Sequence, residues 1–102
     1  MGSYRELERE VSLGDGESIE ATVDPMAEVG KEAGSMGGIV YSFPLVIEGH
    51  GAFIKGGKRL KAAFIKAGAQ TWQRPVRVKI TAKGKPRDVE RDYRVEVTKV
   101  GA

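Results

Sequence analysis

Short segments in which apolar and polar side chains alternate make up much of this chain, and glycine-containing turns separate them. The clearest is residues 76–82, where every second side chain is apolar and Arg77, Lys79 and Thr81 lie between. A period of two places successive side chains on opposite faces of a strand, so such a segment is a half-buried β-strand. Because these segments are many and short, the sequence predicts an antiparallel sheet or closed barrel rather than a wound α/β fold.

The expected elements follow one another in a simple order. The alternation predicts strands near residues 17–29, 38–48, 52–55, 75–83 and 92–100. Residues 58–67 instead place apolar side chains at helical spacing, and Gly68 follows them as a typical C-cap. The predicted fold class is therefore all-β with one helix.

Two regions are less regular than the rest. Residues 6–13 also alternate, although Arg9 interrupts the apolar face, so residues 1–14 are predicted as an extension that adds a strand or a short helix. Pro25 does not fit a central strand and marks an edge or a bulge. Residues 26–37, which contain glycine and serine, are predicted to form a loop or the frayed end of a hairpin.

Length and composition exclude several classes of protein. A chain of 102 residues forms one domain, residues 1–102, and without cysteine it has no disulfide, thiolate nucleophile or cysteine zinc site. No apolar stretch approaches the roughly 20 residues of a membrane helix, and no signal-peptide pattern is visible, so a soluble cytoplasmic protein is expected. The chain has no asparagine and only two glutamines, and this scarcity of thermolabile residues favours a thermophilic source.

Enzymatic interpretations find little support in the residues. Residues 56–59 read Gly-Gly-Lys-Arg, which lacks both the upstream glycine and the Ser or Thr of a phosphate-binding P-loop. The single histidine, His50, lies in a Gly-His-Gly turn and forms no metal cluster with other histidines. We therefore expect a protein that is not an enzyme, with no cofactor, no metal and no small-molecule substrate.

Charge is distributed unevenly along the chain. Residues 1–49 carry three basic and ten acidic side chains, a net charge of −7, whereas residues 50–102 carry fourteen basic and four acidic, a net charge of +10. A strongly positive segment attracts polyanions if its charges share one face, as in nucleic-acid-binding domains. The acidic and basic halves can also pair across the fold and cancel. Both interpretations remain open from the sequence.

The order of the predicted elements resembles a known family. Strand, strand, short strand, helix, strand, strand is the order of the five-stranded OB barrel. With Gly16-Glu17-Ser18 opening the first long strand, residues 57–60 leading into the helix, and a closing hairpin, the chain resembles small OB-fold single-stranded-DNA-binding domains of archaea and their viruses. The resemblance spans roughly residues 15–100 and implies an antiparallel five-stranded barrel that binds a single strand.

Single-strand binding needs a positive groove that follows the phosphates and aromatic rings on which bases stack. We therefore predict binding of single-stranded nucleic acid, DNA rather than RNA, without strong sequence preference. The residues predicted to contact the strand are Trp72, Arg74, Arg77, Lys79, Lys83, Lys85, Arg87, Lys55, Lys58, Phe53 and Tyr41. The loop of residues 83–87 is the foremost contact, because in OB folds this connection flanks the ligand groove. The acidic half would repel the strand from the opposite face.

Several of these residues also have a structural interpretation. Tyr41 and Tyr93 align with the apolar residues of their strands, which favours the interior. Trp72 lies between polar neighbours beside Arg74, so it can stack on bases or close the bottom of the barrel. The basic residues of the helix, Lys58 among them, have an alternative interpretation as its solvated face alone.

A rival function is a protein-interaction module, either a homodimer or a subunit of a larger complex. Acidic residues 1–49 of one chain would face basic residues 50–102 of another. Segments 38–48 and 76–82 would serve as edge strands for pairing between chains. Binding of duplex DNA or double-stranded RNA is a third option, which needs phosphate contacts without exposed rings.

Overall fold

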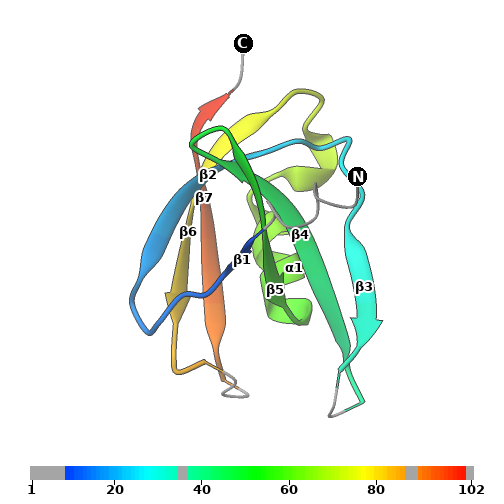
Figure 1. Cartoon of the computed structure of the whole chain (residues 1–102), viewed down its shortest axis with the longest axis vertical. Coiled ribbons are helices and arrows are strands. Elements are labelled where there is room, and N and C mark those ends of the chain that lie inside the picture. Colours follow the sequence, from blue (N-terminus) through cyan, green and yellow to red (C-terminus); the bar gives the residue numbers. More distant parts are fainter. Residues whose placement is uncertain (1–8, 35–36, 87–89, 101–102) are drawn as a thin grey trace.

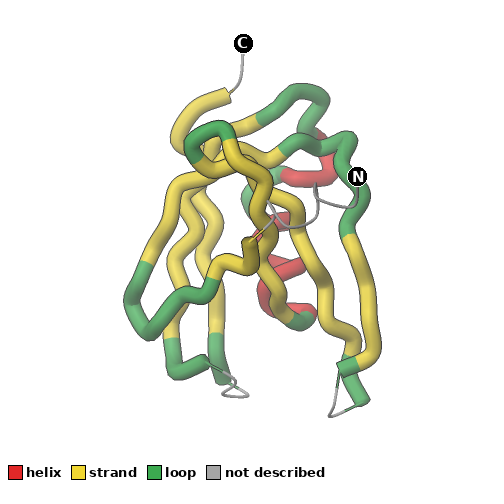
Figure 2. Tube along the Cα trace, viewed as in Figure 1, coloured by secondary structure: helices red, strands yellow, loops and turns green. Residues whose placement is uncertain are grey.

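The computed structural model describes residues 9–34, 37–86 and 90–100 of the chain. Its elements in chain order are β1 (Arg9–Val11), β2 (Ser18–Val23), β3 (Gly30–Ala33), β4 (Ile39–Ile47), β5 (His50–Gly56), helix α1 (Lys58–Lys66), the short 3-10 helix η2 (Ala69–Thr71), β6 (Val76–Lys83) and β7 (Asp92–Val100). Figure 1 shows the strands as one curved sheet, with α1 lying behind β4 and β5 in that view. Figure 2 distinguishes the strands from the loops that join them. The prediction of an all-β fold with one helix is confirmed.

Over the described residues the sheet has seven strands, two more than the predicted barrel. Its strand order is β1-β5-β4-β2-β6-β7, and β3 pairs with β4 beside this path. The pairing of β1 with β5 is parallel, and the other pairings are antiparallel. The predicted amino-terminal strand is thus confirmed over Arg9–Val11, while residues 1–8 lie outside the described part of the chain.

The predicted strand over residues 17–29 forms only in its first part, since β2 ends at Val23 and the next strand, β3, begins at Gly30. Thr22 of β2 pairs with Val46 of β4, and further along β4 Ser42 pairs with Gly30 of β3. The chain leaves the ladder between them in a turn where the carboxylate of Asp24 accepts a hydrogen bond from the Met26 N–H. Pro25 lies in this turn, as its lack of an N–H donor requires. Residues 26–37, predicted as a loop, therefore contain the strand β3.

The two segments predicted as edge strands lie inside the sheet. β4 pairs with β5 on one side and with β2 and β3 on the other. β6 lies between β2 and β7. The proposed cross-chain pairing through residues 38–48 and 76–82 is therefore wrong, because the backbone groups of both strands are already paired within the chain.

One hydrophobic core lies between the sheet and α1. Phe43 of β4 and Phe64 of α1 stack with ring centroids 4.3 Å apart. Val78 and Ile80 of β6, predicted to point inward, are completely buried. Burying a side chain of this size stabilises the fold by about 1.5–3 kcal/mol. The core therefore fixes which face of β4 and β6 points outward.

Helix α1 begins where the sequence predicts and ends one residue earlier, at Lys66. Leu60 and Phe64 are its buried residues, and Gly68 follows it with φ +105°, donating its N–H to the Ile65 carbonyl as a C-cap glycine does. At the start, a Cβ on Gly56 would lie 2.7 Å from the Cβ of Leu60, so glycine is what allows β5 and α1 to approach. No helix among the described residues is long and apolar enough to cross a membrane.

The sheet is not closed into a barrel within the described residues. Its path begins at β1 and ends at β7, and no ladder joins these two strands. The closed barrel expected from the sequence is therefore corrected to an open, curved sheet. The gap, which we call the seam, lies between β1 and β5 on one side and the start of β7 on the other.

Candidate nucleic-acid interface

Two hollows open next to one another on the molecule. The first, the seam pocket, has a volume of about 500 Å³ and is lined by residues 10–13, residues 54–59, Val40, Pro86, Arg91 and Tyr93. The second, the strand-face hollow, has a volume of about 460 Å³ and is lined by Glu28, residues 30–32, Ser42, Pro44, Ala52, Phe53 and Lys55. Lys55 lines both hollows, so they meet at β5.

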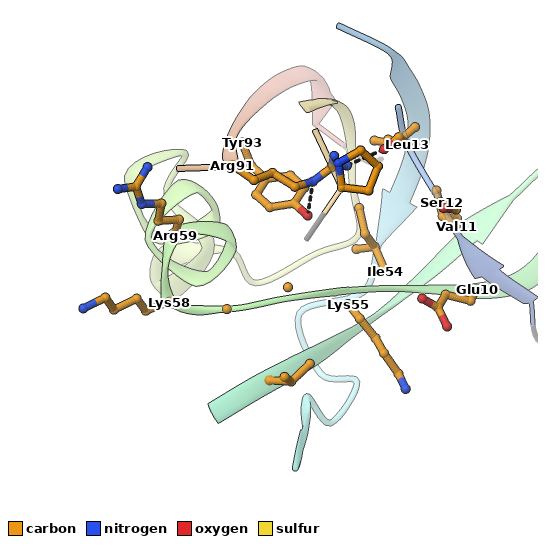
Figure 3. Close-up of a pocket in the computed structure, with 14 residues that line it drawn as sticks. Glu10, Val11, Ser12, Leu13, Ile54, Lys55, Lys58, Arg59, Arg91 and Tyr93 are labelled. Carbon is orange, nitrogen blue, oxygen red and sulfur yellow. Dashed lines mark hydrogen bonds between the residues drawn. The ribbon is translucent and has the colours of Figure 1, made fainter. Parts of the chain in front are cut away.

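The charge of the seam pocket is predominantly positive. Lys58 and Arg59, from the first turn of α1, lie on one side, and residues 10–13 lie on the opposite side (Figure 3). Both basic side chains are exposed, and Arg59 donates a hydrogen bond of 3.1 Å to the Glu90 carbonyl. Among the described residues that line the pocket, Glu10 is the one carboxylate, against four cations. The potential of the pocket is therefore positive on the side of α1.

Arg91 ties the two sides of the seam together. Its guanidinium donates to the hydroxyl of Tyr93 at 2.8 Å, to the carbonyl of Gly84 at 3.1 Å, and to the carbonyl of Leu13. It also lies 5.1 Å from the centre of the Tyr93 ring (Figure 3). These contacts hold Leu13 against the β6–β7 hairpin, and backbone hydrogen bonds of Gly16 and Glu17 with Ala82 hold the same segment further along the chain.

Lys55 is held by a carboxylate from the neighbouring strand. Its Nζ lies 3.0 Å from Oε1 of Glu32 on β3. The hydrogen bond and the charge of Glu32, with a smaller contribution from Glu10, raise the pKa of Lys55 above its usual value. The same ammonium group lies 5.9 Å from the centre of the Phe53 ring. The cation predicted at this position is present, but it is already paired.

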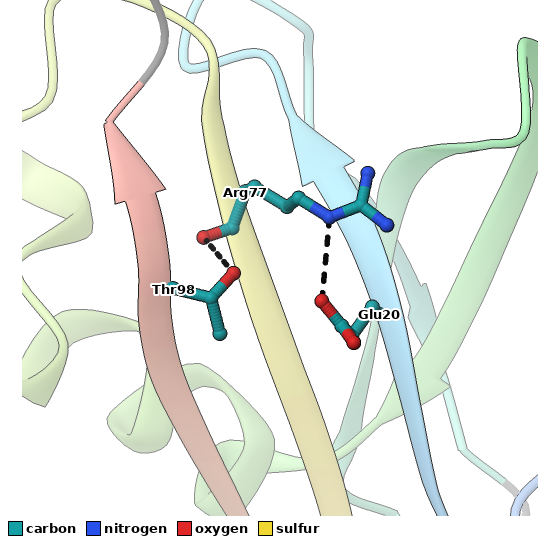
Figure 4. A network of polar contacts seen from close by, with 3 residues as sticks. All are labelled: Glu20, Arg77 and Thr98. Atoms are coloured by element: carbon teal, nitrogen blue, oxygen red, sulfur yellow. Dashed lines mark hydrogen bonds and ion pairs between the residues drawn. The ribbon is translucent and has the colours of Figure 1, made fainter.

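The outward face of β6 is less cationic than the sequence predicts. Arg77 and Lys79 are exposed, as expected from the alternation. Arg77 pairs with Glu20 of β2 at 3.3 Å, and its carbonyl accepts a hydrogen bond of 3.2 Å from Thr98 (Figure 4). Lys79 lies in register with Glu20 on one side and with Glu96 on the other. Carboxylates on both neighbouring strands thus offset the charge of this face.

The acidic and basic halves of the sequence do not occupy opposite faces. β2, from the acidic half, lies between β4 and β6 in the sheet. The ion pairs Glu32–Lys55 and Glu20–Arg77 each join one half to the other. The prediction of an acidic face that repels the strand is therefore wrong, and pairing of the two halves within the chain is confirmed at these sites.

The predicted loop contact lies next to the seam pocket. Lys83 and Lys85 are exposed, and the N–H between them, that of Gly84, is held by the Asp15 carboxylate at 2.9 Å. Pro86 follows them and lines the pocket. Arg87, predicted as part of the same contact, lies outside the described residues. The hairpin loop therefore brings two further cations to the end of the molecule where Lys58 lies.

The aromatic residues differ in how much ring they expose. Tyr41 is 9% exposed and belongs to the core, with Lys61 positioned 4.9 Å from the ring centre, so the core interpretation is confirmed. Trp72 is partly buried and packs against the core after η2. Phe53 is partly buried and lines the strand-face hollow. Tyr93, expected in the interior, is partly buried and lines the seam pocket.

The structure brings together some of the predicted residues and leaves others apart. Lys55, Lys58 and Phe53 line the two hollows, whereas Arg74 is exposed and lines neither of them. Sequence reasoning did not place Arg59, Arg91 or Tyr93 in the site. Within residues 56–59, the sequence predicted Lys58 as a contact but not its neighbour Arg59. The sequence signal for this pocket is the Gly-Gly-Lys-Arg segment at the junction of β5 and α1, where two small residues precede two adjacent cations.

Comparisons with known proteins give no further assignment. A scan against models of protein families finds no match, and searches of curated proteins and of solved structures find none either.

Proposed function

We propose that this protein is an OB-like domain that binds single-stranded nucleic acid, DNA rather than RNA, without strong sequence preference. The pairings of the strands support this arrangement. In this comparison β2 and β3 together correspond to the first strand of an OB barrel, and β4, β5, β6 and β7 correspond to the second to fifth strands. The first strand then pairs with the second and with the fourth. The second strand pairs with the third, and the fourth pairs with the fifth. The helix falls between the third and fourth strands, and OB barrels are themselves partly open.

The location of the two hollows supports the same proposal. OB folds bind oligonucleotides on the face of their second and third strands, between the loops that follow the first and fourth strands. Here that face belongs to β4 and β5 and carries the strand-face hollow with Phe53. The loop after the fourth strand carries Lys83 and Lys85. A strand would lie across Phe53 and continue past Lys55 toward α1.

The observation that carries the proposal is that Lys55 lines both hollows. It connects an aromatic ring, on which a base can stack, with a pocket that has several cations, to which phosphates can bind. Stacking contributes about 1–3 kcal/mol per base to the free energy of binding, and phosphate contacts provide the rest of that free energy. Both components of single-strand binding therefore lie on one continuous surface.

The experiment that tests the function is fluorescence anisotropy of a labelled oligo-dT of about 20 nucleotides, compared with a duplex of equal length at about 50 and 300 mM salt. We expect preferential binding of the single strand. Four phosphate contacts would give a slope near −2.8 in log K against log salt, or about 150-fold weaker binding over this range. No binding of the single strand at the lower salt concentration would overturn the proposal.

A pair of matched variants locates the contact. Lys83→Ala with Lys85→Ala removes two cations from the hairpin loop, and Lys66→Ala with Lys99→Ala removes two exposed cations away from both hollows. The net charge of the two double variants is the same. We expect the first to weaken binding and lower the salt slope by about 1.4, because two phosphate contacts are lost. Equal losses in both variants would indicate nonspecific charge attraction.

The rival function, a protein-interaction module, retains one supporting observation. β3 is exposed along its whole length, and Ile39, paired with Ala33 at its end, is 54% exposed. An edge strand beside an apolar side chain is a place where a second chain could add to the sheet. A mass that rises with concentration, measured by light scattering on a sample without affinity for oligo-dT, would favour this function over strand binding.

A further inference from the structure

We propose that the seam pocket binds the phosphorylated end of a single strand. The terminal base and sugar would occupy the pocket, and the terminal phosphate monoester would lie against Lys58 and Arg59. This inference rests on the proposed function but names a contact that general single-strand binding does not require. A protein can bind single strands through the strand-face hollow without distinguishing ends from interior positions.

The size and lining of the seam pocket suit one nucleotide. Its volume of about 500 Å³ lies within the range of about 300–1,000 Å³ typical of small-ligand pockets, and is too small for a run of several nucleotides. Val11, Leu13 and Ile54 contribute apolar surface, and the Tyr93 ring lines the same space. Aliphatic and aromatic side chains are what a nucleobase packs against.

The arrangement around Leu13 closes the pocket on one side. The segment that follows β1 forms a wall, and Arg91 holds this wall to the hairpin by donating to the carbonyls of Leu13 and Gly84. A strand that enters past Lys55 therefore meets a tethered segment of the chain on the side of β1. This closure favours the end of a strand, because an internal stretch would need a second opening through which the chain leaves the pocket.

The charges at the pocket favour a monoester over a diester phosphate. Lys58 and Arg59 lie on the side opposite to Glu10 and Leu13 (Figure 3). A terminal phosphate carries a charge of about −1.5 to −2 at neutral pH, whereas an internal diester carries a single negative charge. No described carboxylate forms an ion pair with Lys58 or Arg59. The two adjacent cations therefore attract a terminal phosphate monoester more strongly than an internal phosphate diester.

The test compares strands that differ in their ends alone. The probes are oligo-dT with a 5′-phosphate, a 3′-phosphate or two hydroxyl ends, and a circular single strand of the same length. We expect one phosphorylated form to bind about tenfold more tightly than the hydroxyl-ended form, as one added charge-assisted contact provides. The identity of that form would assign the end. Thymidine monophosphate should compete far more weakly than the phosphorylated strand.

Substitutions at the start of α1 test whether the preference for a phosphorylated end comes from the seam pocket. Lys58→Ala with Arg59→Ala should reduce the tenfold ratio between phosphorylated and hydroxyl ends to about one, with unchanged circular dichroism, because both side chains are exposed. Lys58→Glu is a second variant that leaves the Arg59 contact to Glu90 in place, and it should lower the ratio as well. Lys66→Ala, in the last turn of the same helix, should keep the ratio.

The outcomes separate this inference from the proposed function. Equal affinity for circular, hydroxyl-ended and phosphorylated strands would overturn end recognition while leaving single-strand binding intact. If thymidine monophosphate competed as well as the phosphorylated strand does, the pocket would be assigned to a free nucleotide. That result would also overturn recognition of a strand end. Absence of binding to every single strand would overturn both proposals.

Discussion

The Nζ atom of Lys55 lies 3.0 Å from the Oε1 atom of Glu32, and this ion pair joins β5 to β3 where the two hollows meet. A phosphate that approached Lys55 would compete with the Glu32 carboxylate for the same ammonium group. β3 itself is exposed along its length, so Glu32 has access to water on its own side of the pair. In the interface that we propose, this pair would therefore limit the affinity for a strand.

Removing that competitor should strengthen binding. In Glu32→Gln, Lys55 loses its negative partner and becomes available to a phosphate, so we expect the affinity for oligo-dT to rise about threefold to tenfold, as one added cation–phosphate contact provides. Glu48→Gln is the control, because Glu48 is exposed in the β4–β5 turn and lines neither hollow. Anisotropy titrations measure both. Unchanged affinity in Glu32→Gln would show that Lys55 does not contact the strand.

The titration of Lys55 should report the same ion pair. Because Glu32 raises its pKa in the folded protein, Lys55 should lose its proton above the usual value of 10.5. The pair then favours folding below that value, and its contribution disappears as the pH rises through the higher folded pKa. NMR titration of the side chain measures this directly. In Glu32→Gln the pKa should fall toward 10.5, and an unchanged pKa would assign the shift to other groups.

Arg91 should contribute substantially to stability. Arg91→Ala removes the donors to Leu13, Gly84 and Tyr93, so we expect a loss of about 2–3 kcal/mol in the free energy of unfolding. Arg94→Ala is the comparison, since Arg94 is exposed and lies 3.7 Å from Glu96, an arrangement worth less than about 1 kcal/mol. Urea denaturation compares the two variants. Similar losses would show that the seam is held by other contacts.

The junction between β5 and α1 provides a test of packing. In Gly56→Ala the new methyl group would lie 2.7 Å from the Cβ and Cδ2 of Leu60, so we expect destabilisation of about 1–3 kcal/mol. Gly57→Ala is the neighbouring control, because the nearest atom to its added Cβ, the Ile39 carbonyl oxygen, is 4.0 Å away. Thermal unfolding should separate the two. A larger loss in the second variant would contradict the packing described here.

Phe53 should act in binding more than in folding. It is partly buried on the outer face of β5, opposite Pro44, and it lines the strand-face hollow. Phe53→Ala should weaken oligo-dT binding by about 1–3 kcal/mol if a base stacks on the ring. Phe53→Tyr preserves the ring and should retain most of the affinity. Equal affinities for all three proteins would remove Phe53 from the interface.

Local patterns in the sequence predicted the regular elements well. The alternation near residues 75–83 predicted β6 (Val76–Lys83), and the helical spacing near residues 58–67 predicted α1. β3 was not predicted because all four of its residues are exposed, so no apolar alternation marks it. Its strand conformation depends on the ladder to β4, which a single-sequence pattern does not reveal.

The candidate site was less predictable than the fold. Alternation predicted the exposure of Arg77 correctly, but its partner Glu20 is 57 residues away in the chain. The role of Arg91 depends on the carbonyl of Leu13, a backbone group that no side-chain pattern identifies. The sequence therefore indicated which side chains are exposed, while their partners depend on the order of strands in the sheet.

Chemical-shift mapping tests the central claim most directly. A ¹⁵N-labelled sample titrated with oligo-dT should show its largest amide changes at Phe53, Lys55 and the Gly56–Arg59 segment, with smaller changes at Glu20 and Arg77, whose ion pair lies on β2 and β6. Changes concentrated on β2 and β6, or no changes at a saturating concentration of oligo-dT, would contradict an interface centred on Lys55.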